Sequence, residues 1–225
     1  MKLDQIAVEL GKSISFGERE VTFITDNSAK VSEGCIFICI EGKHFDGHTK
    51  AAEALEKGAA AVVVQKDLGL ERQILVENTR SAYAYICAAF YGHPERNLKI
   101  IGVTGTNGKT STTYMLKSII EAAGHKTGLI GTIQNLVGDE VFPAKNTTPG
   151  IYELNELFAK MKQASCEYVL MEVSSHALDQ QRVCGICFDV AIFTNLTQDH
   201  LDYHKTMDKY LEAKKKLFTM CKTAV

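Results

Sequence analysis

Short apolar runs alternate with amphipathic stretches along the chain, a pattern typical of α/β proteins. In the first 95 residues, strands are predicted at Cys35–Ile40, Ala59–Val64 and Ile74–Val76. Helical spacing predicts helices at His48–Lys57, which would end at Gly58, and at Thr79–Tyr91, with Thr79 as a possible N-cap. The break at Gly92-His93-Pro94 then predicts a linker between domains.

The same alternation resumes after this break with longer elements. Strands are predicted at Lys99–Thr104, Lys126–Ile130, Tyr168–Val173 and Phe188–Thr194. Helices are predicted at residues 110–123, before Gly124, and at Leu154–Gln163 and Met207–Phe218. This spacing predicts a doubly wound, mostly parallel sheet. The fold class is therefore α/β, with a small N-terminal domain (residues 1–95) followed by a P-loop-like domain (residues 96–225).

Composition excludes several classes of protein. The 225 residues are 45% hydrophobic and 23% charged, which is typical of globular domains. The net charge is −2 and basic residues are not clustered, so no nucleic-acid partner is indicated. No apolar run reaches the ~18 residues that span a bilayer, and the N-terminus has no signal-peptide core. We expect a cytoplasmic protein whose partners are small molecules, with no membrane partner.

The cysteines fit a reducing compartment. Seven is an odd count without the paired spacing of a secreted scaffold. Cys184 and Cys187 form a CxxC, which leaves a metal or redox role open. A zinc ribbon requires a second pair at suitable spacing, and the sequence has none. Buried or edge cysteines are the simpler interpretation.

The strongest chemical signal is a glycine-rich turn between a predicted strand and a predicted helix, Gly105–Ser111. Glycines let the backbone approach a polyphosphate, and the helix N-terminus adds partial positive charge. Lys109 can reach the terminal phosphates, and the Thr110 hydroxyl can bind Mg²⁺. The glycines stand at 102, 105 and 108 and Val103 takes the first glycine position of G-x4-G-K-[ST], so this is a variant phosphate loop. A plain turn is the weaker alternative, because the flanking elements are those that phosphate binding requires.

Polar side chains follow two later strands where each strand ends. Glu172 ends one strand, and the cluster Thr194–Asp202 follows the next. In parallel sheets ligands gather at the carboxyl ends of strands, so Glu172 and His200 are candidate metal ligands, with Asp199 or Asp202 orienting the histidine. The alternatives are a carboxylate that only caps a helix and a structural histidine.

Other polar segments are less specific on their own. Lys214-Lys215-Lys216 is by composition a solvated helix face. The loops Asn146–Gly150, Thr25–Ser28 and Gly42–Gly47 are ordinary turns or ligand contacts. Gln180 and Arg182 could meet a carboxylate or phosphate. The residues alone leave these alternatives open.

Taken together and in this order, the segments resemble the Mur ligases, and among them the subfamily that adds the third residue to UDP-N-acetylmuramoyl-dipeptide. The matching stretches are GVTGTNGKTSTT from Gly102, KNTTP from Lys145, MEVSSHAL from Met171, FTNLTQDHLDYH from Phe193 and YLEAKKKLF from Tyr210. The strand Cys35–Ile40 and the DGH at Asp46 extend the resemblance into the first domain. GTNGKT alone would mark only the wider superfamily, which includes folylpolyglutamate synthetases.

The resemblance implies a role for each segment. The ATP phosphates would be bound by Gly105, Thr106, Asn107, Gly108, Lys109, Thr110 and Ser111. The Mg²⁺ shell would be Thr110, Glu172, His200 and Lys214, the last as a carbamate formed with CO₂; Lys109, Glu172, His200 and Lys214 would be catalytic. The UDP-muramoyl-dipeptide would be bound by Asn146, Thr147, Thr148, Ser174, Gln180 and Arg182. Its uridine-diphosphate end would be bound by Ser28, Lys43, His44 and Phe45, although Ala29 stands where the family has an arginine.

The implied activity is ATP-dependent amide-bond formation in peptidoglycan synthesis. ATP phosphorylates a carboxylate of the D-glutamyl residue, and a diamino acid then attacks the acyl phosphate. The family has three domains, so we expect the ATPase domain to be incomplete and the third domain to be absent. One alternative is a folylpolyglutamate-type ligase, against which the first domain and KNTTP argue. The other is a fragment that binds ATP or UDP-sugar without catalysis.

Overall fold

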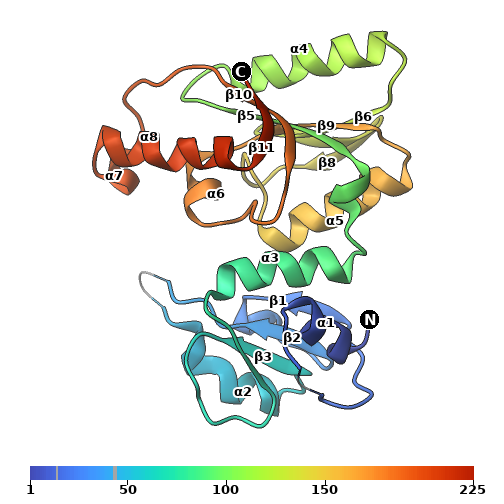
Figure 1. Ribbon diagram of the computed structural model, residues 1–225, viewed down its shortest axis with the longest axis vertical. Helices are drawn as coiled ribbons and strands as arrows, with labels where there is room; N and C mark the ends of the chain where they lie inside the picture. Colours follow the sequence, from blue (N-terminus) through green and yellow to red (C-terminus); the bar gives the residue numbers. More distant parts are fainter. Residues whose placement is uncertain (14, 43–44) are drawn as a thin grey trace. The chain divides into compact units, whose positions relative to one another are not determined.

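The chain folds into two compact α/β units. The computed structural model describes residues 1–13, 15–42 and 45–225. The units are Met1–Gly92 and His93–Val225, and each is built around a sheet of its own (Figure 1). This architecture confirms the fold class that the sequence predicts.

The first unit has a four-stranded parallel sheet in the order β1-β2-β3-β4. The strands are β1 (Phe23–Thr25), β2 (Cys35–Ile38), β3 (Ala61–Val64) and β4 (Gln73–Leu75). Every residue of β2 and β3 is buried, as expected for strands covered on both faces. Helix α2 (Ala51–Glu56) packs Ala51 and Ala54 against the sheet, while α3 (Thr79–Phe90) contacts β3 and α1 (Leu3–Glu9) contacts α3.

Two local predictions in this unit need correction. The stretch predicted as one helix at His48–Lys57 begins as a 3₁₀ turn, Gly47–Lys50, and continues as α2. The N-cap of α3 is Asn78, whose side chain accepts from the N–H groups of Arg80 and Ser81, so the expected cap at Thr79 is wrong. Asn78 has the extended backbone that a cap requires, whereas Thr79 is the first residue of the helix.

The second unit has a seven-stranded sheet in the order β11-β10-β5-β9-β6-β7-β8. Five strands run parallel: β5 (Lys99–Thr104), β6 (Thr127–Ile130), β9 (Tyr168–Glu172), β10 (Phe188–Phe193) and β11 (Cys221–Ala224). An antiparallel hairpin, β7 (Gln134–Val137) and β8 (Glu140–Pro143), extends the sheet from β6. Strand β11 and the hairpin were not predicted from the sequence, but the largely parallel sheet is confirmed.

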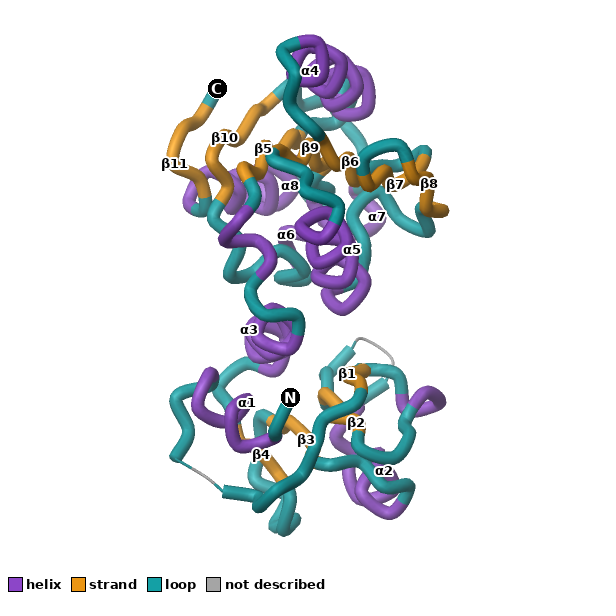
Figure 2. Tube along the Cα trace, turned by 90° about the vertical axis from the view of Figure 1, so that its right-hand side faces the viewer, coloured by secondary structure: helices purple, strands orange, loops and turns teal. Residues whose placement is uncertain are grey.

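Helices lie on both faces of this second sheet. Figure 2 shows α4 (Lys109–Ala122) on one face, with α5 (Ile151–Gln163), α6 (Ser175–Asp179) and α8 (Met207–Lys215) on the other. Leu154 and Phe158 of α5 pack with Val169 and Met171 of β9 in the main core. The predicted helix Met207–Phe218 ends earlier, because α8 passes into a 3₁₀ turn at Lys216–Thr219.

The register of the sheet fixes where polar side chains meet. Val103 of β5 lies opposite Glu172 of β9, and Thr104 lies opposite Phe193 of β10. The carboxyl ends of β5, β9 and β10 therefore share one edge, and the segments that follow them lie side by side. Among the described residues, no helix is both long and apolar enough to cross a membrane.

Candidate functional site

The glycine-rich loop joins the end of β5 to the start of α4. Gly105 has φ 147°, and a Cβ atom there would lie 1.9 Å from the Thr194 hydroxyl oxygen. Gly108 precedes the first turn of α4 with φ 85°. Both conformations are in the region that favours glycine, so the loop depends on these two positions.

The segment that follows β10 is hydrogen-bonded to the backbone of this loop. The N–H of Thr106 donates to the Asn195 carbonyl at 3.0 Å, and the N–H of Asn107 donates to the Asn195 side chain at 3.0 Å. In return, Asn195 and Thr194 donate to the Asn107 carbonyl at 3.1 and 2.6 Å. Two of the N–H groups expected to face phosphate are thus paired within the chain.

Two lysines converge on the same loop. Lys109 donates to the carbonyls of Gly105 and Thr106, each at 2.9 Å, and Lys214 donates to Gly105 at 2.8 Å. Burial lowers the pKa of Lys109, opposed by nearby Glu172 and Asp199. Lys214 is 1% exposed, and burial together with the charge of Lys109 lowers its pKa to about 8. The Lys214 side chain is thus buried and that of Lys109 partly buried beside the glycine-rich loop.

Glu172 is fully buried at the end of β9. The Thr110 hydroxyl lies 3.0 Å from each of its carboxylate oxygens. On the other side, the Thr132 N–H and hydroxyl each donate to it at 3.0 Å. The structure therefore brings together Thr110 and Glu172, as predicted for candidate metal ligands, and adds Thr132.

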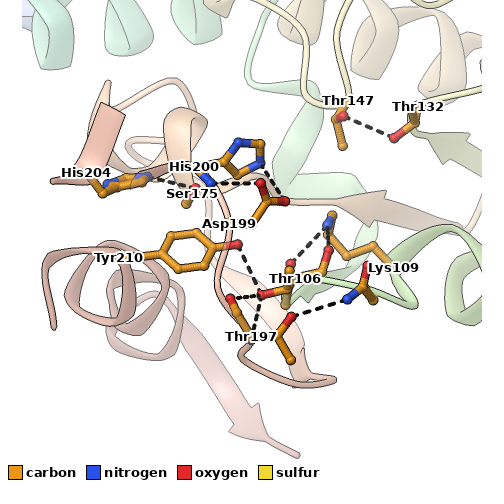
Figure 3. A network of polar contacts seen from close by, with 12 residues as sticks. Thr106, Lys109, Thr132, Thr147, Ser175, Thr197, Asp199, His200, His204 and Tyr210 are labelled. Atoms are coloured by element: carbon orange, nitrogen blue, oxygen red, sulfur yellow. Dashed lines mark hydrogen bonds and ion pairs between the residues drawn. The ribbon is translucent and has the colours of Figure 1, made fainter. Parts of the chain in front are cut away.

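His200 stands at the start of the short helix α7 (Leu201–His204), with a left-handed φ of 52°. Its ring nitrogen lies 3.5 Å from Asp199, which makes Asp199 rather than Asp202 the observed neighbour (Figure 3). The ring is half exposed and lies 4.9 Å from the ring of His176. Within the described ranges, no group of three His, Cys, Asp or Glu side chains is arranged to hold a metal.

Most of the candidate substrate residues on the second unit form one hydrogen-bonded group. The Thr148 hydroxyl donates to the Glu172 carbonyl at 2.9 Å and lies 3.2 Å from the Ser174 hydroxyl. Arg182 donates to the Thr148 carbonyl at 2.9 Å and to the Gln180 side chain at 3.1 and 2.7 Å. Thr147 lies 3.0 Å from Thr132, and Asn146 is exposed in the same loop (Figure 3).

The remaining candidates are more dispersed. Ser28 starts a 3₁₀ turn that Asn27 caps, and Phe45 is half exposed; both belong to the first unit. Lys43 and His44 lie outside the described residues. Ser111 is exposed on the first turn of α4.

The two other lysines of the triplet are surface residues. Lys215 and Lys216 are exposed and pair with Glu212 and Asp179. Cys184 and Cys187, the CxxC pair, are not in a disulfide, and Cys187 is exposed.

Sequence reasoning missed three residues that build the site. Thr132 lies in a turn after β6 that carries no motif, and Asn135 in β7 accepts from the Gly131 N–H at 3.3 Å. Asn195 binds the phosphate loop. The position of Asn195 at the end of β10 was the one available signal, because strand β10 lies beside β5.

Two family models match this chain, and both describe Mur ligases. A model described as Mur ligase middle domain matches residues 103–225, and one described as Mur ligase family, catalytic domain, matches residues 20–112. A UDP-N-acetylmuramoyl-L-alanyl-D-glutamate–2,6-diaminopimelate ligase of Bacillus velezensis is 49% identical over 205 residues, or 91% of this chain and 42% of that protein. A ligase of the same name from Clostridium acetobutylicum is 46% identical and covers 100% of this chain and 48% of that protein. The chain thus spans less than half the length of these curated relatives.

The similar solved structures that follow are also Mur ligases. A structure of a UDP-N-acetylmuramoyl-L-alanyl-D-glutamate–2,6-diaminopimelate ligase superposes with a TM-score of 0.82 at 26% identity, covering 100% of this chain and 46% of that one. The MurF ligase of Thermotoga maritima in complex with ADP superposes with a TM-score of 0.58 at 26% identity, covering 91% of this chain and 44% of that one.

Proposed function

The chain belongs to the Mur ligase family, and on that premise we propose that it forms the substrate- and ATP-binding part of a peptidoglycan ligase. The reaction would join 2,6-diaminopimelate to UDP-N-acetylmuramoyl-L-alanyl-D-glutamate, as the names of its relatives state for those proteins. The residue-based prediction left the diamino acid open; the relatives' names now favour diaminopimelate. Residues 1–95 would bind the UDP end of the substrate and residues 96–225 the ATP.

One observation carries the proposal: Lys109, Thr110 and Glu172 converge where the phosphate loop meets the carboxyl edge of the sheet. Thr110 contacts Glu172, and Lys109 lies at the loop carbonyls. A cation, a hydroxyl and a buried carboxylate are the groups needed for a metal-bound polyphosphate. The structure of the Thermotoga maritima MurF ligase, solved in complex with ADP, supports nucleotide binding by a chain of this fold.

The donor set fits Mg²⁺. Glu172 and Thr110 supply oxygen ligands, which hard divalent cations prefer, and His200 would complete the protein's contribution. The ion would supply neutralisation of charge on the transferring phosphoryl group. The buried position of Glu172 favours this role, because a buried carboxylate is stabilised by a bound cation.

Lys214 fits a carbamate. Its amine is buried, donates to the Gly105 carbonyl, and has a pKa lowered to about 8, so a neutral amine is accessible near physiological pH. Addition of CO₂ to that neutral amine, with release of one proton, would give a carbamate anion that can bind metal. Lys215 and Lys216 are exposed and paired with carboxylates, which disfavours both for this modification.

The chain's own residues would then divide the work of the reaction. Lys109 would neutralise charge on the phosphoryl group as it moves to the D-glutamyl carboxylate. Asn146, Thr147, Thr148, Ser174, Gln180 and Arg182 would bind and orient the UDP-muramoyl-dipeptide. Ser28, Lys43, His44 and Phe45 would bind its uridine-diphosphate end. The amine of the diamino acid would attack the acyl phosphate, releasing phosphate. The seven cysteines, none of which is in a disulfide, favour a cytoplasmic location.

The test has two measurements on the purified chain. Calorimetric titration with a non-hydrolysable ATP analogue and Mg²⁺ measures nucleotide binding, and mass spectrometry after incubation with UDP-N-acetylmuramoyl-L-alanyl-D-glutamate, ATP, Mg²⁺ and diaminopimelate detects ligation. Binding with ligation supports the whole proposal, and binding without ligation supports the binding part alone. Absence of nucleotide binding would overturn it.

A further inference from the structure

Thr132 lies between the two halves of the candidate site. Its hydroxyl is 3.0 Å from Glu172, the proposed metal carboxylate. The same hydroxyl is 3.0 Å from Thr147, a proposed substrate residue (Figure 3). Its backbone N–H donates to the other oxygen of Glu172 at 3.0 Å. Thr132 is thus in direct contact with both sides of the site, although it belongs to neither predicted set.

The chemistry of these groups fixes the direction of the hydrogen bonds. A hydroxyl carries a single hydrogen, and an ionised carboxylate can only accept. The Thr132 hydroxyl is the donor toward both Glu172 and Thr147, so its single hydrogen is shared between them, and the charged carboxylate is the stronger acceptor. The result is a hydrogen-bonded link from Thr147 through Thr132 to Glu172.

The turn that carries Thr132 is fixed from two directions. A Cβ atom on Gly131 would lie 2.4 Å from a carboxylate oxygen of Glu172, so the turn approaches the carboxylate as closely as glycine allows. The side chain of Asn135, which is 1% exposed, accepts from the Gly131 N–H. These contacts hold both donors of Thr132 against Glu172 before any ligand binds.

The two threonines on Glu172 therefore have different roles. Thr110 comes from the first turn of α4 and is itself a proposed metal ligand, whereas Thr132 comes from the turn after β6 and contacts no other proposed ligand of the metal in the described contacts. Groups behind a metal ligand orient it and tune its affinity for the metal.

We propose that Thr132 is a positioning residue that orients the Glu172 carboxylate for the divalent cation and couples it to Thr147 on the substrate side. This inference rests on the proposed function. It makes two separate claims: that the hydroxyl of Thr132 sets the affinity for Mg²⁺, and that the contact with Thr147 transmits substrate binding to the metal carboxylate.

The experiment compares Thr132→Val, which keeps the shape and the N–H but removes the hydroxyl, with Thr132→Ser, which keeps the hydroxyl. Titration of the full chain with a non-hydrolysable ATP analogue is done over a range of Mg²⁺ concentrations and without Mg²⁺. Thr132→Val should raise the Mg²⁺ concentration for half-maximal binding about tenfold or more and leave Mg²⁺-free affinity unchanged. Thr132→Ser should keep the Mg²⁺ concentration for half-maximal binding near the wild-type value. The control Thr223→Val, at an exposed position in β11, should match wild type.

A second variant tests the coupling, and it also serves if Thr132→Val does not fold. In wild type, UDP-N-acetylmuramoyl-L-alanyl-D-glutamate should lower the Mg²⁺ concentration for half-maximal binding, and Thr147→Val should abolish that effect. The inference is overturned, without the proposed function, if Thr132→Val leaves the Mg²⁺ dependence of nucleotide binding unchanged. It is also overturned if Thr132→Val lowers nucleotide affinity equally with and without Mg²⁺ and Thr132→Ser does not restore that affinity. A wild-type chain that binds no Mg²⁺–nucleotide overturns the proposed function and this inference with it.

Discussion

Lys109 and Lys214 donate to the same carbonyl oxygen, that of Gly105, at 2.9 and 2.8 Å. The first lysine comes from α4 and the second from α8, which lie on opposite faces of the sheet (Figure 2). Two amines that meet at one carbonyl concentrate positive charge at the phosphate loop. That arrangement favours an anionic ligand, because the two protonated amines repel each other and an anion beside them is attracted to both.

Replacement of Lys109 by alanine should weaken nucleotide binding. A hydrogen bond to a charged phosphate is worth roughly 1.5–3 kcal/mol, so the dissociation constant of a non-hydrolysable ATP analogue should rise about ten- to a hundredfold. Calorimetric titration measures it, and Lys215→Ala, which removes an exposed lysine paired with Glu212, is the matched control. Equal affinity in wild type and Lys109→Ala would remove Lys109 from the nucleotide site.

Lys214 should be the lysine that reacts with CO₂. Only the neutral amine reacts, and because the pKa of Lys214 is lowered to about 8, the neutral fraction increases as the pH rises through that value. With ¹³C-labelled CO₂ at matched dissolved concentration, the carbamate signal in the NMR spectrum should grow from about pH 7 to about pH 9.

Two variants identify the modified residue. The carbamate signal should disappear in Lys214→Met and persist in Lys215→Met, since Lys215 is exposed and paired with a carboxylate. A signal that survives in Lys214→Met would assign the carbamate elsewhere. A signal that falls as the pH rises would contradict the lowered pKa.

The same buried amine should cost stability. The pKa of Lys214 is about 8 in the folded chain and about 10.4 for an ordinary lysine, so between these values the unfolded state binds more protons. The cost is present in full below about pH 8 and fades as the pH rises toward the unfolded value. In buffer depleted of CO₂, Lys214→Met should therefore be more stable than wild type at neutral pH, with a free energy of unfolding about 1–3 kcal/mol higher as measured by urea denaturation. The difference should shrink at alkaline pH. A variant less stable than wild type at neutral pH would show that the hydrogen bond to Gly105 outweighs desolvation.

The glycine-rich loop and the strand ends could be predicted because local sequence determines them. A glycine-rich turn between an apolar strand and a helix has few structural solutions, and β5 matches its predicted bounds of Lys99–Thr104. Glu172 could be placed because buried parallel strands end at one edge. In both cases the signal lies within a few consecutive residues.

Contacts between distant segments could not be predicted in this way. Thr132 contacts Glu172 from 40 residues away, and Asn195 binds Asn107 from 88 residues away. The hairpin β7–β8 and the strand β11 are short and only partly buried, so their patterns are weak. Nor does the sequence reveal that Lys214 is buried while Lys215 and Lys216 are exposed, because that depends on which face of α8 meets the phosphate loop.

A methyl group at Gly105 should unfold the loop locally. The Cβ atom of Gly105→Ala would lie 1.9 Å from the Thr194 hydroxyl oxygen, and its φ of 147° is unfavourable for alanine. Gly124→Ala is the control, since Gly124 also has a positive φ of 89° but has no atom within 4 Å of the added methyl. Backbone strain alone costs about 1–3 kcal/mol, so Gly124→Ala should lose that much and Gly105→Ala clearly more, as measured by urea denaturation. Equal losses would mean that Thr194 moves aside freely.

Replacement of Arg182 by lysine should impair binding of the UDP-muramoyl-dipeptide and spare the nucleotide. The planar guanidinium donates to Gln180 through two nitrogens and to the Thr148 carbonyl through a third, which a lysine amine cannot reproduce. Loss of one charged hydrogen bond from Arg182 to the substrate would cost roughly 1.5–3 kcal/mol, so substrate affinity should fall about tenfold or more. Titration of the chain with UDP-N-acetylmuramoyl-L-alanyl-D-glutamate and, separately, with the ATP analogue and Mg²⁺ measures the two affinities. The control is Arg96→Lys, at a largely exposed arginine.

Because Thr148 also donates to the Glu172 carbonyl, a general disturbance of the site would lower the affinity for both ligands together. Equal loss of both affinities would therefore assign Arg182 to the framework of the site and not to the substrate, and unchanged substrate affinity would exclude Arg182 from recognition.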